Sequence, residues 1–158
     1  MTVEVGKKVP AFSLPLSDGS SWKTSDCFSK DGAGKLVLFF YPKAMTGGCT
    51  LEGQEFRDLH AAFKRAKTTV LGISKDSCAR QAKFRAKEKF PFELLSDEDE
   101  KVCRLFDVIR EKSLYGRKFM GIERSTFLFG ADGKLAREWR KVRVAGHAAE
   151  VLEAAKAL

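Results

Sequence analysis

Two short, apolar runs separated by a helical pattern constrain the fold of this chain more than any other feature. The runs are Leu36–Tyr41 (LVLFFY) and Thr69–Ser74 (TVLGIS). Apolar runs of this length are typical of strands buried on both faces of a sheet. Between them Phe56, Leu59 and Phe63 recur at helical spacing, which predicts a helix with one apolar face. Strand, crossover helix and strand form a βαβ unit, so we expect the two strands to be parallel.

Other patterns extend this unit into a larger α/β fold. A third apolar run, Ser125–Phe129, is followed by GADG, which predicts a β-hairpin turning at Asp132-Gly133. The N-terminal stretch VPAFSLPLSDGSSWKT is expected to add another hairpin. Further helices are expected over 77–89, over the stripe Val102, Leu105, Phe106 and Ile109, and around Val151, Ala155 and Leu158. These elements predict a mixed central sheet flanked by helices, and 158 residues suit one domain over 1–158.

The charge balance does not point to nucleic acid. Lysine and arginine total 29 against 21 acidic residues, a net charge of +8. The basic residues are spread along the chain among apolar and acidic ones, so a solvated basic surface is the expected interpretation. No apolar run is long enough for a signal peptide or a membrane span. We therefore expect a cytoplasmic protein that binds neither membrane nor nucleic acid.

Cysteine usage argues against a disulfide framework and against a structural metal site. In the cytosol, cysteines are expected to be thiols unless one of them is catalytic. No CxxC pair occurs, and the two histidines are far from the cysteines in sequence, so zinc-ligand spacing is absent. The cysteines in question are Cys27, Cys49, Cys78 and Cys103.

Cys49 stands out because of its neighbours. It follows the most apolar strand and precedes Thr50-Leu51-Glu52, which begins a helix; ligand sites in open α/β sheets lie past the carboxyl ends of strands. A helix N-terminus offers unpaired N–H groups and a positive dipole end, which favour a thiolate. Gly47 and Gly48 allow close backbone approach to a small ligand, and the Thr46 hydroxyl lies three residues before the thiol. A cysteine that only packs is the commoner role, but cores are seldom built behind Gly-Gly in a loop, so function is favoured.

The same stretch carries a family resemblance. Pro42–Cys49 (PKAMTGGC) fits Pro-x-x-x-Thr-x-x-Cys, the active-site signature of peroxiredoxins. The surrounding FFYPKAMTGGCTLEGQEFRDL resembles the subfamily called PrxQ or bacterioferritin comigratory protein. So do LGISKDS, FELLSDEDEKVCRLFDV, YGRKFMGIERSTFLF and WRKVRVAGH, in the expected order and spacing. The resemblance implies a thioredoxin-like fold, reduction of hydrogen peroxide and organic hydroperoxides, and no cofactor.

The resemblance also implies roles for individual residues. Carried over by position, Cys49 is the peroxidatic cysteine, which the peroxide oxidises to a sulfenic acid. Thr46 hydrogen-bonds to the peroxide, Pro42 shields the thiolate from water, and Arg124 stabilises the thiolate and the transition state. Gly48 is expected to contact the substrate together with Thr46 and Arg124.

Two further positions near the cysteine carry expectations. The family usually has proline where Gly47 stands, so the loop is expected to be floppier here; this bears on the rate and not on the chemistry. Glu52 is expected to orient the active-site arginine. Its alternative role is that of an ordinary first-turn acid stabilised by the helix dipole.

The resolving cysteine is less plainly marked. In the family a second thiol condenses with the sulfenic acid, and thioredoxin or glutaredoxin then reduces the disulfide. The two usual resolving positions fall here at Gln54 and at Arg85, while Cys78 lies seven residues before the latter. Cys49 and Cys78 both follow adjacent parallel strands, which places them at one edge of the sheet. We therefore expect Cys78 to be the resolving cysteine; the absence of an internal resolving cysteine is the second expectation, and resolution by Cys103 is the third. A disulfide between Cys49 and Cys78 requires their Cα atoms to come within about 7 Å, so a helix end would have to unwind.

The remaining cysteines and histidines receive simple expectations. Cys103 sits beside an apolar stripe and is expected to pack, and Cys27 has no predicted role. His60 is expected to be solvated, and His147 to help cap the last helix.

Rival functions remain open at the level of sequence. Thiol–disulfide exchange is disfavoured by the missing CxxC. A one-cysteine peroxidase resolved by an external thiol is the nearest alternative. A non-enzymatic basic module that binds nucleic acid or a protein is the other, and its affinity would fall steeply with salt concentration if it bound phosphates. The resemblance implies a monomer.

Overall fold

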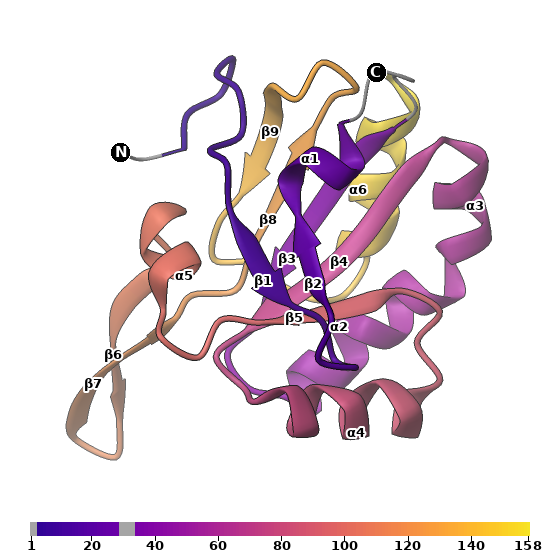
Figure 1. Cartoon of the computed structure of the whole chain (residues 1–158). Helices are drawn as coiled ribbons and strands as arrows, with labels where there is room; N and C mark the ends of the chain where they lie inside the picture. Colours follow the sequence, from indigo (N-terminus) through magenta and orange to yellow (C-terminus); the bar gives the residue numbers. More distant parts are fainter. Residues whose placement is uncertain (1–2, 29–33) are drawn as a thin grey trace.

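A five-stranded mixed sheet forms the centre of the molecule. The computed structural model describes residues 3–28 and 34–158. The strand order is β5-β4-β3-β8-β9 (Figure 1). The strands are β3 (Lys35–Phe40), β4 (Thr68–Ser74), β5 (Glu93–Ser96), β8 (Ser125–Phe129) and β9 (Leu135–Trp139). The α/β fold with a mixed central sheet is the one that the sequence patterns predicted, and its thioredoxin-like kind is the one that the resemblance implied.

The βαβ prediction is confirmed. Strands β3 and β4 are parallel and in register from Lys35↔Thr68 to Phe40↔Ile73. Strand β8 pairs antiparallel with β3 on the other side, and the β8–β9 hairpin turns through Asp132-Gly133 as expected. The N-terminal hairpin is also present, as β1 (Ser13–Pro15) and β2 (Ser21–Lys23).

Both faces of the central strand are buried, which explains its unbroken apolar sequence. Leu36, Leu38 and Phe40 point into the core on one face of β3, and Val37 and Phe39 point into the core on the other. Alternate side chains of a strand project to opposite faces, so a strand covered on both sides needs apolar residues at every position.

Helices cover both faces of the sheet (Figure 1). The helix predicted between β3 and β4 is broken into two at Leu59, whose backbone leaves helical geometry with φ −100° and ψ 4°. Phe56 and Phe63, on either side of the break, still share one core, with ring centroids 5.8 Å apart. The helices are α1 (Thr24–Cys27), α2 (Gly47–Asp58), α3 (His60–Arg65), α4 (Cys78–Glu88), α5 (Lys101–Leu105) and α6 (His147–Lys156).

Helix α5 is shorter than the sequence predicted. The expected apolar stripe ran to Ile109, but the helix ends at Leu105. Asp107 adopts a left-handed backbone with φ 56°, and the N–H groups of Asp107 and Val108 donate to the carbonyls of Arg104 and Cys103. These two bonds form a Schellman C-cap, which usually has glycine at the left-handed position. Ile109 consequently begins a strand.

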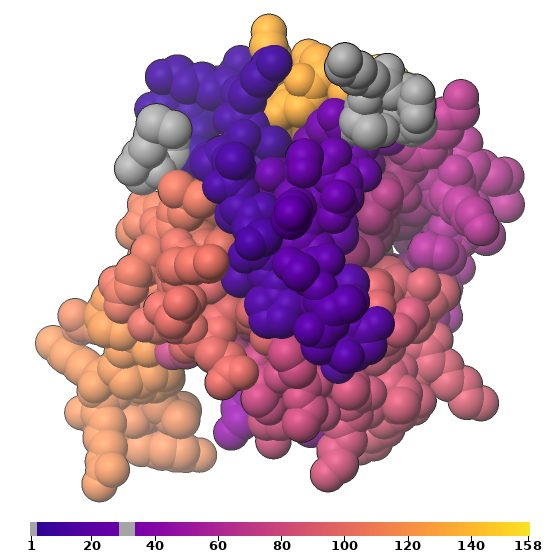
Figure 2. All heavy atoms as spheres, in the orientation of Figure 1, coloured from indigo at the N-terminus to yellow at the C-terminus, as the bar shows by residue number. Residues whose placement is uncertain are grey.

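A second unexpected element follows from this early stop. Strands β6 (Ile109–Leu114) and β7 (Arg117–Ile122) form a two-stranded hairpin outside the central sheet. Tyr115 and Gly116 both have positive φ, which is the two-residue turn that matches strand twist. Figure 2 shows the hairpin, in orange, protruding from the body of the molecule.

No helix in the described parts of the chain is long and apolar enough to cross a bilayer.

Candidate active site

Cys49 lies buried at the start of α2. The chain leaves β3, passes through Pro42–Thr46 and enters the helix at Gly47, with Thr46 at the N-cap. The side chain of Cys49 is 1% exposed. The thiol therefore sits two residues inside a helix N-terminus, where free backbone N–H groups and the helix dipole favour negative charge. This is the placement predicted from the sequence.

Arg124 contacts the thiol of Cys49 although it lies 75 residues later in the sequence. It follows β7, and its Nη2 lies 3.4 Å from Cys49 Sγ. Its Nη1 donates to Glu52 Oε1 at 2.8 Å. Burial lowers the pKa of Arg124, but the negative charges of Glu52 and Cys49 more than offset this, so its pKa is raised. The guanidinium is thus permanently charged and held by two groups on the same helix.

Glu52 is the most deeply buried acid of the site. It is 1% exposed, and its Oε2 has no hydrogen-bond partner among the described residues. Burial raises its pKa, Arg124 lowers it in part, and the net result is a pKa of about 7. The expectation that Glu52 orients the arginine agrees with the 2.8 Å contact.

The raised pKa of Glu52 predicts a distinctive pH dependence of stability. Unfolded, this carboxyl releases its proton near its usual pKa of 4.5, whereas folded it keeps the proton up to about 7. The folded state therefore binds more protons in that window, and its stability falls as the pH rises. Relative to Glu52→Gln, we expect the wild-type free energy of unfolding to decline by up to about 1 kcal/mol per pH unit between these values. Urea titrations across the window measure this, with the exposed Glu153→Gln as the control that shows no such trend.

Gly48 lets the arginine approach. A β-carbon placed on Gly48 would lie 3.0 Å from Arg124 Nη2, whereas one on Gly47 would meet nothing within 4 Å. The absence of a side chain at Gly48 is therefore part of the geometry that brings the guanidinium to Cys49.

Gly47, by contrast, can be replaced by the proline that is usual in the resembling family. It is the first residue of α2, and Thr46 before it is extended with φ −96° and ψ 160°. Proline is favoured at the first helical position, and an extended residue before it is the one that proline requires. Gly47→Pro should raise the free energy of unfolding by about 0.5–1 kcal/mol, measured by denaturant titration. A loss of stability would contradict the open geometry described for this position.

Thr46 and Pro42 lie in the loop before the helix. Thr46 is exposed, and its hydroxyl donates to the carbonyl of Lys43 at 2.8 Å. Its oxygen lone pairs therefore remain able to accept a hydrogen bond. Pro42 is half-buried directly after β3.

Cys78 begins α4 at the same edge of the sheet, as predicted. It is half-buried and, like the other three cysteines, a free thiol. An unpredicted residue, Asp76, ties the two loops together: its Oδ2 accepts from the N–H of Ala44 at 2.8 Å, and its Oδ1 from Arg80 at 2.9 Å. The sequence signal for it was an acid just past a parallel strand and before a helix. Gln54 donates to Glu88 across α2 and α4.

Some of the expectations for the other cysteines and for the two histidines agree with the structure, and others do not. Cys103 is fully buried in the core, in agreement with packing, and burial raises its pKa. Cys27 is half-buried. His60 is half-buried rather than solvated. The capping role predicted for His147 is wrong, because its side chain turns into the core and its Nε2 lies 2.8 Å from Thr126 Oγ1.

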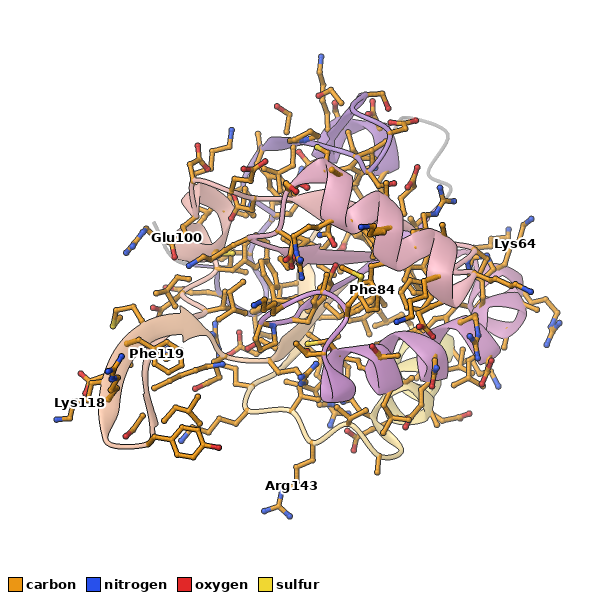
Figure 3. The ribbon with its side chains drawn as sticks, turned by 90° about the horizontal axis from the view of Figure 1, so that it is seen from below. Lys64, Phe84, Glu100, Lys118, Phe119 and Arg143 are labelled. Atoms are coloured by element: carbon orange, nitrogen blue, oxygen red, sulfur yellow. The ribbon has the colours of Figure 1, made fainter. Side chains whose placement is uncertain are left out.

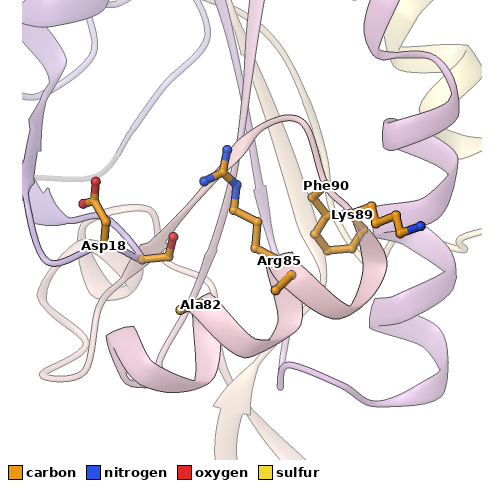
Figure 4. Close-up of a pocket in the computed structure, with 7 residues that line it drawn as sticks. Asp18, Ala82, Arg85, Lys89 and Phe90 are labelled. Carbon is orange, nitrogen blue, oxygen red and sulfur yellow. The ribbon is translucent and has the colours of Figure 1, made fainter.

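A cavity of about 470 Å³ lies elsewhere and takes no part in this site. It is found where α4 meets the loop after β1, and Figure 4 shows Asp18, Arg85 and Phe90 along its wall. The guanidinium of Arg85 is held by interactions within the fold. Its Nε donates to the carbonyl of Phe92 at 3.0 Å, and its Nη1 lies 3.2 Å from Glu93 Oε1. Among the described residues, no three His, Cys, Asp or Glu side chains gather as metal ligands would.

Comparison with known proteins agrees with this site. The chain matches the AhpC/TSA family over residues 5–138. It is 44% identical to peroxiredoxin Bcp of Bacillus subtilis, over 99% of this chain and 97% of that protein. A crystal structure of a Xylella fastidiosa PrxQ variant superposes with a TM-score of 0.91 at 41% identity, covering 99% and 98% of the two chains.

A third comparison gives the same result. A Xanthomonas campestris bacterioferritin comigratory protein, whose alkyl peroxide reduction activity has been studied structurally, superposes with a TM-score of 0.88 at 44% identity, with 98% of each chain covered. These similarities favour the peroxidase over the binding module. The chain belongs to the AhpC/TSA family, as a peroxiredoxin of the Bcp or PrxQ kind, and is a thiol-dependent peroxidase.

Proposed function

We propose that Cys49 is the peroxidatic cysteine and that this enzyme reduces hydrogen peroxide and organic hydroperoxides. The observation that carries the proposal is the 3.4 Å approach of Arg124 Nη2 to a buried thiol at a helix N-terminus. The activity of the Xanthomonas campestris relative toward alkyl peroxides supports organic hydroperoxides as substrates.

The first step is nucleophilic displacement at oxygen. The thiolate of Cys49 attacks one oxygen of ROOH, an S–O bond forms and the O–O bond breaks. The products are the sulfenic acid and RO⁻, which takes a proton from solvent to give the alcohol or water. Arg124 and the backbone N–H groups at Gly48 face the charge that develops on the leaving oxygen, and Thr46 accepts a hydrogen bond from the peroxide. Pro42 shields the thiolate from water.

Resolution by Cys78 completes the proposed cycle. Its thiolate attacks the sulfenic sulfur, a disulfide forms and hydroxide leaves as water after protonation. Asp76 already holds the two loops together, but Cys49 is buried within α2, so the first turn of one or both helices must open. Thioredoxin or glutaredoxin then reduces the disulfide.

The proposal also covers the location, oligomeric state and partners of the enzyme. We infer a cytoplasmic monomer formed by one domain over 1–158, working without a cofactor and without nucleic-acid or membrane partners. The free thiols and the ordinary spread of charge support this setting.

Intact mass after one equivalent of hydrogen peroxide, without reductant, tests the proposal. Wild type should lose about two mass units by forming a disulfide, while Cys78→Ser should gain about 16 as a sulfenic acid. Gain of oxygen by both proteins would make this a one-cysteine enzyme that needs an external thiol. No change in either protein would overturn the assignment of Cys49.

Replacement of Arg124 should slow the first step. Arg124→Ala removes the cation nearest the thiol and leaves Glu52 buried without its partner. We expect the rate of Cys49 oxidation to fall by about a hundredfold, measured by stopped flow. Arg140→Ala removes a nearby loop arginine that bonds to the carbonyls of Phe106 and Asp107 instead, and serves as control. A rate for Arg124→Ala equal to wild type would refute the role of the arginine.

A further inference from the structure

We propose that Asp76 and Arg80 form a clamp on the loop before Cys49, and that release of this clamp controls how fast the oxidised Cys49 is resolved. This inference deepens the proposed function and rests on resolution by Cys78. Both residues act by positioning the loop, without touching the substrate. The carry-over from the resembling family assigns no role to either of them.

The clamp binds both backbone polar groups of Ala44. Asp76 Oδ2 accepts from the Ala44 N–H at 2.8 Å, and Arg80 Nη2 donates to the Ala44 carbonyl at 3.2 Å. The two side chains also bind each other, since Arg80 Nε donates to Asp76 Oδ1 at 2.9 Å. Ala44 itself is 1% exposed, so the two side chains take the place of the water that its peptide groups would otherwise bind.

The carboxylate of Asp76 is held in place by the sheet. Its side chain is 7% exposed, and its Oδ2 also accepts from the hydroxyl of Ser74 at 2.6 Å, at the end of β4. The Ser74 hydroxyl in turn accepts from Gln81 at 3.0 Å. Asp76 is therefore the fixed side of the clamp, and the loop that carries Ala44 is the side that can leave.

The clamp lies on either side of Cys78 in the sequence. Asp76 comes just before α4, and Arg80 lies in the first turn of that helix, as Cys78 does. Figure 3 shows this helix from below, with Phe84, one turn after Arg80, facing into the core. Ala44 lies in the loop that leads into α2. The clamp thus joins the two segments that carry the two reacting thiols.

Resolution has to break this clamp. The disulfide needs the Cα atoms of Cys49 and Cys78 within about 7 Å, and the first turn of one or both helices must open for that. Opening at α4 carries Arg80 away from the Ala44 carbonyl, and opening at α2 that reaches the loop carries Ala44 away from both side chains. Either movement separates buried polar groups from their partners, which slows the opening.

The rate of opening decides what the sulfenic acid of Cys49 becomes. If Cys78 arrives first, its thiolate attacks the sulfenic sulfur, the S–S bond forms, and hydroxide leaves as water after protonation. If a second molecule of hydrogen peroxide arrives first, the sulfenic sulfur attacks it, the O–O bond breaks, and a sulfinic acid and water form. A clamp that delays opening therefore favours the sulfinic acid at high peroxide, and loss of the clamp favours the disulfide.

Hydrogen exchange in the reduced protein, followed by NMR, tests the clamp without any thiol chemistry. Arg80→Met keeps an unbranched stem but loses the bonds to Asp76 and to the Ala44 carbonyl. The Ala44 N–H should then exchange about tenfold faster than in wild type. Arg104→Met is the matched control, because Arg104 pairs with Glu100 at the same i,i+4 spacing but on α5. In that variant the Ala44 N–H should exchange as in wild type.

The products of oxidation test the effect on resolution. The reduced proteins are treated with increasing hydrogen peroxide without reductant, and intact mass separates the disulfide, about 2 mass units lighter, from the sulfinic acid, about 32 heavier. Arg80→Met should need about tenfold more peroxide than wild type to give half sulfinic acid. Asp76→Asn should do the same, because its amide must turn an N–H group toward either Arg80 or the Ala44 N–H. The double variant should need no more peroxide than either single variant, since both remove one clamp, and Arg104→Met should match wild type.

Three results would overturn the inference. They are unchanged exchange of the Ala44 N–H in Arg80→Met, an unchanged peroxide requirement in both clamp variants, and an equal shift in Arg104→Met. A wild type that forms no disulfide at all, while Ala44 still exchanges faster in Arg80→Met, would instead overturn resolution by Cys78, and the control of resolution would fall with it. The failure of the clamp and the failure of the proposed function can therefore be told apart.

Discussion

Peroxide turnover should vanish in Cys49→Ser. The serine hydroxyl is nearly isosteric but does not ionise at neutral pH, and oxygen in this position forms no counterpart of the sulfenic acid. The buried site and the Arg124–Glu52 pair would remain, so the loss is chemical rather than structural. We expect less than about a thousandth of the wild-type rate in a thioredoxin-coupled assay of peroxide consumption.

Cys27→Ser is the matched control for this loss. Cys27 is a half-buried thiol whose Sγ lies 3.9 Å from the carbonyl oxygen of Lys35, outside the site described above. It should retain wild-type turnover. Turnover that persists in Cys49→Ser and disappears in Cys27→Ser would show that the wrong thiol has been assigned.

Among the glycine-to-alanine substitutions in α2, Gly53→Ala should cause the largest loss of stability. A β-carbon at Gly53 would lie 2.3 Å from Phe90 Cζ and 2.8 Å from Cε1. Movement of Phe90 is resisted because its ring stacks on Phe92 and packs edge-on against Phe84. Alanine gains about 1 kcal/mol of helix propensity over glycine, but overpacking should outweigh it and leave a net loss of about 3 kcal/mol.

Two other glycines of the same helix make the experiment internally controlled. Gly47→Ala meets no atom within 4 Å, so it should not lower stability and should leave the rate close to wild type. Gly48→Ala presses on Arg124 and should slow peroxide reduction while changing stability little. Denaturant titration and stopped-flow oxidation of the three variants measure these effects. Equal stability of Gly53→Ala and Gly47→Ala would contradict the packing of Phe90 described here.

The parts of the fold that were predictable are those whose residues face the core on a regular period. Strand β3 is buried at almost every position, so its apolar run was a sufficient signal. Strands β6 and β7 are exposed along most of their length and offer no such period. Their hairpin also depends on Asp107 ending α5 in a conformation that usually requires glycine.

The site divides in the same way. The residues next to Cys49 in the sequence were enough to single it out as a functional thiol. The role of Arg124 came only from the family resemblance. Asp76 acts through a contact between segments far apart in the chain, and no local pattern marks such a contact. Burial likewise decides the pKa of Glu52, which a sequence does not display.

The position of Cys78 has a consequence for how much of the protein the catalytic cycle disturbs. From Gln81 onward α4 is fastened to the sheet, since Gln81 donates to the carbonyl of Leu95 and Arg85 to that of Phe92. Within α4, only the first turn, before these anchors, has to move if Cys78 resolves Cys49. The apolar layer beneath the rest of α4, which includes Phe84, would then stay covered in both redox states, so the opening of α4 alone would expose no new apolar surface to proteases or to other copies of the protein.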